Sequence, residues 1–341
     1  MAKVSIQIVT WNSLNYIFDC LESLMRQSFR DFSVLVIDNG SDDGTVEFIR
    51  SNYPTVSILQ NFKNTGFCKA NNQGILLAKS EYVLVVNPDV ILDQNYLQNL
   101  VTFADQCPKG ASFGGKILKI HSEAFDLNEE SGLREVVKSD VIDSVGFKIF
   151  KSRRVVDWGE GEKDQGQYDK VQEVFGNTGA CVLYRQSALQ DIVIKNEFFD
   201  NDFFAYKEDI DIAWHFRLSG WQCWYCPTAI CYHHRQFPGA GENLIKNFKH
   251  RRAVSKVLRS LSLRNYHLML VKNDQWSNVV MSLPWFLFRE LKIVIYALIL
   301  EPFQYQTLVE FFKLLPSALR KRKVIMAHKK VSAKEMRKWF K

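Results

Sequence analysis

The sequence lacks the features of membrane-spanning, disulfide-rich and disordered proteins. The apolar run 293–300 has only eight residues, whereas a membrane-spanning helix needs roughly 20. Seven cysteines, an odd number that falls mostly in apolar runs, favour buried thiols in a reducing compartment over a disulfide framework. The mean hydropathy of -0.16 and the charged fraction of 24% fit an ordinary globular protein.

The N-terminus also lacks a secretory signal, because Met1-Ala2-Lys3 leads directly into the short alternating segment 4–9. We therefore expect a cytoplasmic protein. Its 341 residues suggest two structural units.

The net charge of +7 is distributed very unevenly along the chain. Residues 1–241 carry 23 Lys/Arg against 31 Asp/Glu, whereas residues 242–341 carry 21 against 6. An acidic body is thus followed by a strongly basic C-terminal region. Such an asymmetry indicates an anionic surface as the partner of the basic part.

Short β-branched runs alternate with helical patterns through the first hundred residues. Strands are predicted at 4–9, 33–37, 56–59 and 82–86, and helices at 14–27, 45–51, 67–79 and 94–103. This rhythm predicts an α/β fold with a mostly parallel, Rossmann-like sheet and helices on both faces. Ligands of such sheets bind at the C-terminal ends of the strands.

Two phosphate-binding signatures can be set aside. No G-x-G-x-x-G follows the first strand, where Thr10-Trp11-Asn12 stands instead. The segment 110–116 matches G-x-x-x-x-G-K, but Ile117 replaces the Ser or Thr that would bind magnesium. A dinucleotide-binding enzyme and a P-loop enzyme are both disfavoured.

Beyond residue 120 the pattern changes. Residues 121–173 are polar and are predicted to form loops or an insertion over the sheet edge. Regularity returns with a strand at 181–184 and a helix at 209–219. We expect the catalytic domain to cover 1–241 and a basic, aromatic helical region to cover 242–341, with helix breaks at Pro302 and Pro316.

Acidic residues follow two of the predicted strands. Asp38 either forms an Asx turn before a helix capped by Asp42 or Asp43, or accepts the imide N–H of uracil or thymine. Asp89, in Asn87-Pro88-Asp89, is either part of a plain turn or a ligand of Mg²⁺ or Mn²⁺ with diphosphate oxygens and water.

A second acidic group, Glu208, Asp209 and Asp211, begins the helix that follows an aromatic run. These residues either complement the helix N-terminus or supply a general base. His233 is a candidate ligand of the catalytic metal. A structural zinc site at Cys223-x-x-Cys226 is disfavoured, because the two thiols of a strand would face opposite sides.

Six spaced motifs together resemble the family 2 inverting glycosyltransferases of GT-A fold, with the greatest likeness to bacterial rhamnosyltransferase-like members. The likeness covers about residues 3–255. The motifs are Thr10-Trp11-Asn12, the segment 37–44 around Asp38, Asn64 through Gly74, Asn87-Pro88-Asp89, Gly179-Ala180-Cys181, and Phe204 through Arg217.

The resemblance implies a nucleotide-diphosphate sugar donor and single displacement with inversion. Donor-contacting residues would be Thr10, Asn12, Asp38, Asn64, Asn87 and Arg251. Asp89 and His233 would hold Mg²⁺ or Mn²⁺. Asp209, beside Glu208, would be the catalytic base. The family's D-x-D is here Asn87-Pro88-Asp89, which removes one carboxylate.

The same resemblance favours dTDP-rhamnose as the donor, with a UDP-hexose or UDP-N-acetylhexosamine as the alternative. The acceptor would be a cell-surface glycan or a polyprenyl-linked glycan. A non-catalytic scaffold at the membrane is a further alternative from a different class of protein.

The C-terminal region is predicted to lie on the cytoplasmic membrane surface. Within 279–300 the charges Arg289, Glu290 and Lys292 disfavour a spanning helix. An interfacial helix is expected instead, with Trp285, Phe286 and Phe288 at the boundary. The segment 332–341 repeats the pattern. Packing on the enzyme or on a second subunit is the alternative, and a nucleic-acid partner is disfavoured because the aromatics cluster with aliphatics.

Overall fold

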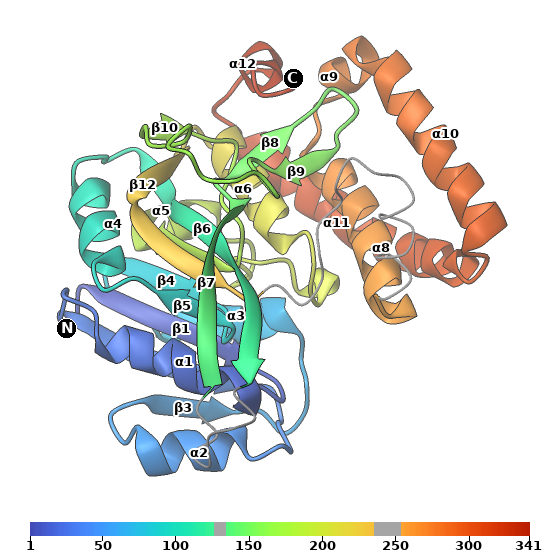
Figure 1. The fold of residues 1–341 in the computed structure, drawn as a ribbon. Coiled ribbons are helices and arrows are strands. Elements are labelled where there is room, and N and C mark those ends of the chain that lie inside the picture. The colour runs from blue at the N-terminus through green and yellow to red at the C-terminus, as the bar shows by residue number, and fades with distance from the viewer. Residues whose placement is uncertain (126–133, 235–253) are drawn as a thin grey trace.

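A computed structural model describes residues 1–125, 134–234 and 254–341 of the chain. A large mixed sheet forms the centre of the body, and a group of C-terminal helices lies on one side of it (Figure 1). The strand order is β10-β12-β6-β11-β4-β1-β2-β3, with β5 paired to β12 and β7 paired to β6.

The parallel half of the sheet confirms the predicted alternation of strands and helices. Its strands β1 to β4 are Val4–Thr10, Phe32–Asp38, Ser57–Gln60 and Tyr82–Val86. The helices α1 to α4 are Leu14–Met25, Thr45–Asn52, Phe67–Leu77 and Tyr96–Asp105. Strand β1 pairs in parallel with β2 and β4, and β2 pairs in parallel with β3. These strands are buried on both faces, which explains their continuous apolar runs.

Two hydrophobic clusters cover the two faces of the sheet. Val83 and Val85 belong to one cluster, and Leu84 and Val86 belong to the other. This split follows from the strand period of two. It shows that helices protect both faces, as the sequence predicts.

The second half of the sheet adds longer strands in mixed directions. The remaining strands are β5 Val90–Leu92, β6 Gly110–Phe125, β11 Cys181–Arg185 and β12 Gln222–His233. Strand β11 is antiparallel to β4, and β12 is parallel to β6. The helices after β11 are α5 Gln186–Ile192, the short 3-10 helix η1 Asn201–Phe203, and α6 Glu208–Leu218. The strand and helix predicted around 181–184 and 209–219 are thus confirmed.

The loop prediction for 121–173 is wrong for much of that segment. Strand β6 extends into it and pairs with β7, Arg134–Ser144, and β8 Phe147–Ile149 pairs with β9 Val155–Asp157. A short β10, Gln172–Glu173, pairs with β12. Polar residues dominate because one face of these strands is solvated, while Ile142 and Phe147 enter the core.

The C-terminal helices are α8 Lys256–Asn273, α9 Trp276–Met281, α10 Leu283–Leu300, α11 Gln304–His328 and α12 Ala333–Arg337. The predicted break at Pro302 separates α10 from α11. The predicted break at Pro316 is wrong, because this residue lies inside α11. Proline removes one helical N–H bond, and here α11 packs along α8 (Figure 1), which compensates for that loss.

Part of the C-terminal region packs into the core of the body. Met269, Ala318, Ile325 and Phe340 belong to the same buried cluster as Trp214 of α6. The expectation that 332–341 faces a membrane is wrong, since Met336 is buried and the rings of Phe340 and Trp214 are 5.9 Å apart. Packing on the enzyme, the alternative considered, holds for α8, α11 and α12. The predicted boundary at 241 lies outside the described residues.

Helix α10 differs from its neighbours. It lies at the outer edge of the helical group (Figure 1), and none of its residues is buried. Phe286 packs against the core, so its predicted place at a membrane boundary is wrong; Trp285 and Phe288 are exposed, and their place at a membrane stays a prediction. In the parts of the chain that the structure describes, no helix is both long and apolar enough to cross a membrane.

Paired buried charges join the C-terminal helices to α6. Lys272 Nζ lies 2.5 Å from Asp200 Oδ2 and 2.7 Å from Asp211 Oδ2, and all three side chains are nearly inaccessible. Arg153 and Asp274 form a second buried pair at 2.7 Å. Such charges must remain paired, because an isolated buried charge is costly.

We expect Lys272→Met to lower the free energy of unfolding by about 3–5 kcal/mol, because the buried Asp211 would lose its cation while Asp200 would keep only Lys321. Urea unfolding measures this change. Lys330→Met, which breaks an exposed pair with Asp191, should cost no more than about 1 kcal/mol. Equal losses in the two variants would contradict the assigned importance of Lys272.

Candidate active site

Asp38 organises the loops that follow β1 and β2. Its Oδ1 accepts hydrogen bonds from Thr10 Oγ1 at 2.9 Å and Ser41 Oγ at 2.5 Å, and its Oδ2 accepts from the amides of Gly40 and Ser41 at 3.0 Å. The Asp38 side chain is fully buried. The Asx turn considered from the sequence is therefore present, whereas contact of Asp38 with a nucleobase stays a prediction.

The predicted helix cap at Asp42 or Asp43 is wrong, because Gly44 is the N-cap residue of α2; Asp43 Oδ1 accepts from the Thr45 amide at 3.0 Å from one position further upstream. Asn12 lies in the left-handed region with φ of 50°. Its Oδ1 accepts from the Asp42 amide at 3.0 Å. The loop after β1 is therefore fixed against the loop after β2.

Asn39 connects these loops to the one after β3, a role that the sequence did not reveal. Its amide donates to Thr10 O, and its Nδ2 donates to Gly66 O at 3.3 Å. Asn64 Oδ1 accepts from the Gly66 amide at 2.9 Å. The structure thus brings Thr10, Asn12 and Asn64 to one edge of the sheet, as the strand order predicts.

Asp89 and His233 also meet, although 144 positions separate them in the chain. His233 Nε2 lies 3.5 Å from Asp89 Oδ1, and its Nδ1 lies 2.8 Å from Asp143 Oδ2. Burial by itself would lower the pKa of His233. The hydrogen bond to Asp143 and the charges of Asp89 and Asp143 outweigh this effect and raise that pKa to about 10. The pocket therefore stabilises positive charge.

This arrangement fits a divalent cation. Asp89 Oδ1 is buried without a hydrogen bond, and Asp143 orients the imidazole so that Nε2 faces Asp89, as carboxylates behind metal-bound histidines do. Within the described residues no group of three or more His, Cys, Asp or Glu is arranged so that it could hold a metal ion by itself. Two protein ligands suit Mg²⁺ or Mn²⁺, which usually retain water and substrate phosphate oxygens.

Cys223 and Cys226 belong to different hydrophobic clusters on opposite faces of the sheet. Their thiols therefore point apart. This geometry confirms the reason for disfavouring zinc at this pair.

Glu208 and Asp209 begin α6 in a poorly solvated place. Glu208 is 8% exposed, and its Oε2 has no hydrogen bond. Burial, together with the charge of Asp209, raises the pKa of Glu208 to about 8. Burial also raises the pKa of Asp209, whose Oδ2 accepts from the Gly179 amide at 3.1 Å. Raised carboxyl pKa values suit proton transfer near neutral pH.

The third acid of the group has a different role. Asp211 is bound by Lys272 at 2.7 Å and by Asn273 Nδ2 at 2.6 Å. It therefore anchors α6 to α8. Only Glu208 and Asp209 remain for chemistry.

Backbone hydrogen bonds place the acids of α6 beside the loop after β4. The Asn87 amide donates to Ala180 O at 2.8 Å, and the neighbouring Gly179 amide donates to Asp209. Asn87 and Asp209 are thus held by adjacent residues. Arg251, the predicted diphosphate contact, lies outside the described residues.

Asp143 and Gly179 were not identified as contributors to the site from the sequence. Asp143 lies in the stretch predicted to be loops, and nothing in its neighbourhood indicates a histidine partner. The Gly179 amide belongs to a quoted motif, but a backbone donor leaves no sequence signal.

The sheet and the grouped strand-end loops define a glycosyltransferase of GT-A fold. Among solved structures, GalNAc-T7 with UDP, GalNAc and Mn²⁺ is similar with a TM-score of 0.57 at 13% identity, over 80% of this chain and 48% of that one. Staphylococcus aureus TarS 1–349 is similar with a TM-score of 0.51 at 18% identity, over 96% of this chain and 86% of that one. These likenesses concern the fold.

The family model "Glycosyl transferase family 2" matches residues 5–193, and the chain belongs to this family. It is 26% identical over 238 residues to the N-acetylglucosaminyl-diphospho-decaprenol L-rhamnosyltransferase of Mycobacterium tuberculosis, covering 67% of this chain and 74% of that protein. It is 25% identical over 234 residues to the poly-beta-1,6-N-acetyl-D-glucosamine synthase of S. aureus, and the match covers 67% of this chain and 49% of that protein.

The raised pKa of Glu208 makes stability depend on pH. A proton binds more tightly to the folded chain than to the unfolded one, so the free energy of unfolding should fall as the pH rises from about 4.5 to about 8. The slope is at most about 1.4 kcal/mol per pH unit. We expect Glu208→Gln to lose this contribution and to gain stability relative to the unmodified chain over that range.

Urea unfolding at several pH values measures the difference. Glu335→Gln is the control, because hydrogen bonds from Ser332 lower the pKa of this exposed carboxyl. The change that Glu335→Gln causes in the free energy of unfolding should therefore no longer vary with pH above about pH 5. A Glu208→Gln difference that stays constant with pH would contradict the assigned titration.

Proposed function

We propose that the protein transfers a sugar, L-rhamnose from dTDP-rhamnose, to a hydroxyl of a cell-surface or lipid-linked glycan, with inversion at the anomeric carbon. The observation that carries this proposal is the placement of Asp209, with its raised pKa, next to the Asn87-Pro88-Asp89 loop in a chain of glycosyl transferase family 2. The match to a rhamnosyltransferase supports the choice of sugar.

Asp209 is the proposed general base. An acceptor hydroxyl is a weak nucleophile at neutral pH, and a positioned base contributes roughly 10²–10⁴ in rate. The Gly179 amide fixes one carboxylate oxygen of Asp209. Glu208, buried beside it, keeps negative charge out of the pocket while it is protonated and so raises the fraction of Asp209 that is ionised.

Asp89 and His233 are the proposed ligands of Mg²⁺ or Mn²⁺, with Asp143 holding the imidazole. The cation would neutralise charge on the leaving diphosphate. Thr10, Asn12, Asp38, Asn64 and Asn87 form the proposed donor site, together with Arg251 from outside the described residues.

A UDP-hexose or UDP-N-acetylhexosamine donor is the second candidate. The relative named as a poly-N-acetylglucosamine synthase and the fold neighbour with UDP favour it. Thermal shift with Mn²⁺ and each nucleotide sugar separates the two candidates, since the preferred donor should raise the melting temperature most.

We assign α10 to an anionic membrane surface, where a lipid-linked acceptor would lie. Glu290 faces inward to His267 of α8 at 2.9 Å, whereas large apolar side chains face outward. The exposed ones include Leu287, Phe288, Leu291, Val294, Leu298 and Ile299. Exposed Lys292 adds positive charge to α10 itself.

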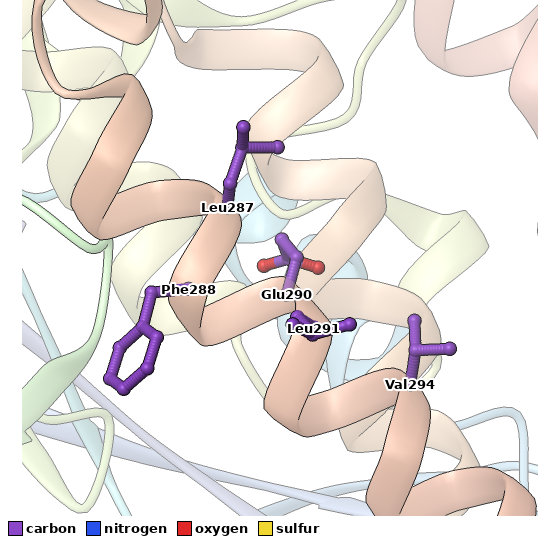
Figure 2. A pocket seen from close by; sticks show the side chains of 5 residues that line it. All are labelled: Leu287, Phe288, Glu290, Leu291 and Val294. Atoms are coloured by element: carbon purple, nitrogen blue, oxygen red, sulfur yellow. The ribbon is translucent and has the colours of Figure 1, made fainter.

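An open hollow of about 430 Å³ lies on α10 between Glu290 and this apolar face, and its lining residues all come from α10 (Figure 2). It is formed by Leu287, Phe288, Glu290, Leu291 and Val294. A hollow on one helix surface does not enclose a nucleotide. It fits an acyl chain better than a polar substrate.

We expect Asp209→Asn to reduce sugar transfer by at least about 10²-fold while leaving donor affinity nearly unchanged, because the amide cannot accept the acceptor proton. Asp89→Ala should instead weaken Mn²⁺-dependent donor binding in calorimetry. Unaltered turnover in Asp209→Asn would remove Asp209 from the mechanism. If the protein neither hydrolysed a nucleotide sugar nor transferred its sugar, the result would support the scaffold alternative.

We expect the full chain to float with anionic liposomes at low salt. The double variant Leu291→Glu/Leu298→Glu should remain unbound, because it places two charges on the apolar face of α10. Leu76→Glu/Leu77→Glu is the matched control, since these exposed leucines lie at the end of α3. No flotation of the unmodified chain, or equal losses in both double variants, would contradict the assignment of α10.

A further inference from the structure

The turn that leads into α6 has an unusual backbone. Phe204, Tyr206 and Lys207 have φ values of 65°, 74° and 72°, although none of them is glycine. A left-handed backbone is unfavourable for such residues, because Cβ then lies too close to the following carbonyl oxygen. Residues in this region persist only where the surrounding structure holds them.

The Asn265 side chain of α8 holds this turn by donating to the backbone carbonyls of the turn. Its Nδ2 donates to Phe203 O at 2.9 Å, to Ala205 O at 2.8 Å and to Tyr206 O at 2.9 Å. Asn265 is completely buried. Two amide hydrogens are thus shared among three carbonyls of one turn.

Arg264 supports Asn265 from the preceding position of α8. Its Nε donates to Asn265 Oδ1 at 3.1 Å, which orients the amide. Its Nη2 donates to Asp202 O at 2.8 Å and Phe203 O at 3.2 Å. Arg264 and Asn265 together therefore donate to the backbone carbonyls of residues 202, 203, 205 and 206.

The conformation of the turn fixes where α6 begins. Lys207 is the N-cap residue, and the Asp211 amide donates to Lys207 O at 2.9 Å. The Cys68 amide donates to Phe204 O at 3.1 Å, so the turn also abuts α3. Glu208 and Asp209 follow directly, and a shift of the turn would move both carboxylates.

We propose that Asn265, oriented by Arg264, is a positioning residue for the Glu208–Asp209 pair. This inference rests on the proposed function, in which Asp209 is the base. Asn265 does not touch the reacting groups. It acts through the carbonyls of residues 203, 205 and 206.

The test uses the full chain with Asn265→Ala. We expect kcat for dTDP-rhamnose turnover with Mn²⁺ to fall about 10- to 100-fold, since small displacements of a catalytic group have effects of that size. The KM for the donor should stay within about twofold, because Asn265 has no hydrogen bond to any proposed donor residue in the part of the chain that the structure describes. Hydrogen exchange of amides 205–211 should become faster.

Asn278→Ala is the matched control. Asn278 is also a fully buried asparagine of the C-terminal helices, but it binds Gln275 and Arg337. Its variant should keep kcat and the exchange of amides 205–211 unchanged. Equal falls of kcat in both variants would overturn the inference, because the loss would then be one of general stability.

The two proposals fail differently. If the unmodified chain turns over no nucleotide sugar, the proposed function fails, and hydrogen exchange alone then decides the role of Asn265. Exchange in Asn265→Ala that matches the unmodified chain overturns the positioning role. A normal kcat in Asn265→Ala, in a chain that is active, overturns it while leaving the proposed function intact. If Asn265→Ala does not fold, Asn265→Ser must show the same kcat loss and unchanged KM.

Discussion

The buried lysine between Asp200 and Asp211 is the interaction on which the rest of the structure depends. Lys272 comes from α8, Asp200 precedes η1 and Asp211 belongs to α6, so one cation joins three segments. Lys321 of α11 adds a second cation to Asp200. Burial would raise the pKa of Asp200, but the two lysines lower it to about 2. Because separating these charges would leave them buried and unpaired, the C-terminal helices form part of the catalytic body.

Two opposite electrostatic environments lie close together at the strand ends. Asp89 and Asp143 surround His233 and stabilise positive charge there. Glu208 and Asp209 are instead desolvated, so protons bind to them more tightly. The proposed cation site thus lies beside the proposed base, and the two environments suit the opposite charges that the proposed sugar transfer would develop. The Gly179 amide, which donates to Asp209, and the Ala180 carbonyl, which accepts from the Asn87 amide, fix the two environments relative to each other.

The C-terminal helices combine two tasks that the basic composition could not separate. On helix α8, Asn265 donates to the backbone of the turn before α6, and His267 binds Glu290 of α10. Helix α10 thereby keeps Glu290 on its inner side while many of its large apolar side chains stay exposed, unlike those of an ordinary surface helix. The same helical group thus stabilises the proposed site and presents the surface assigned to the membrane.

The sequence by itself determined the parallel half of the sheet, the strand-end motifs and the acidic start of α6, because these depend on local periodicity and on motif order. Only the tertiary structure decided that residues 134–144 form a strand, that α11 continues through Pro316, and that Asp143 holds His233. It also decided that Asn265 holds the turn before Glu208. These features depend on partners distant in the chain, and a contact between distant residues leaves no periodic signal in either segment.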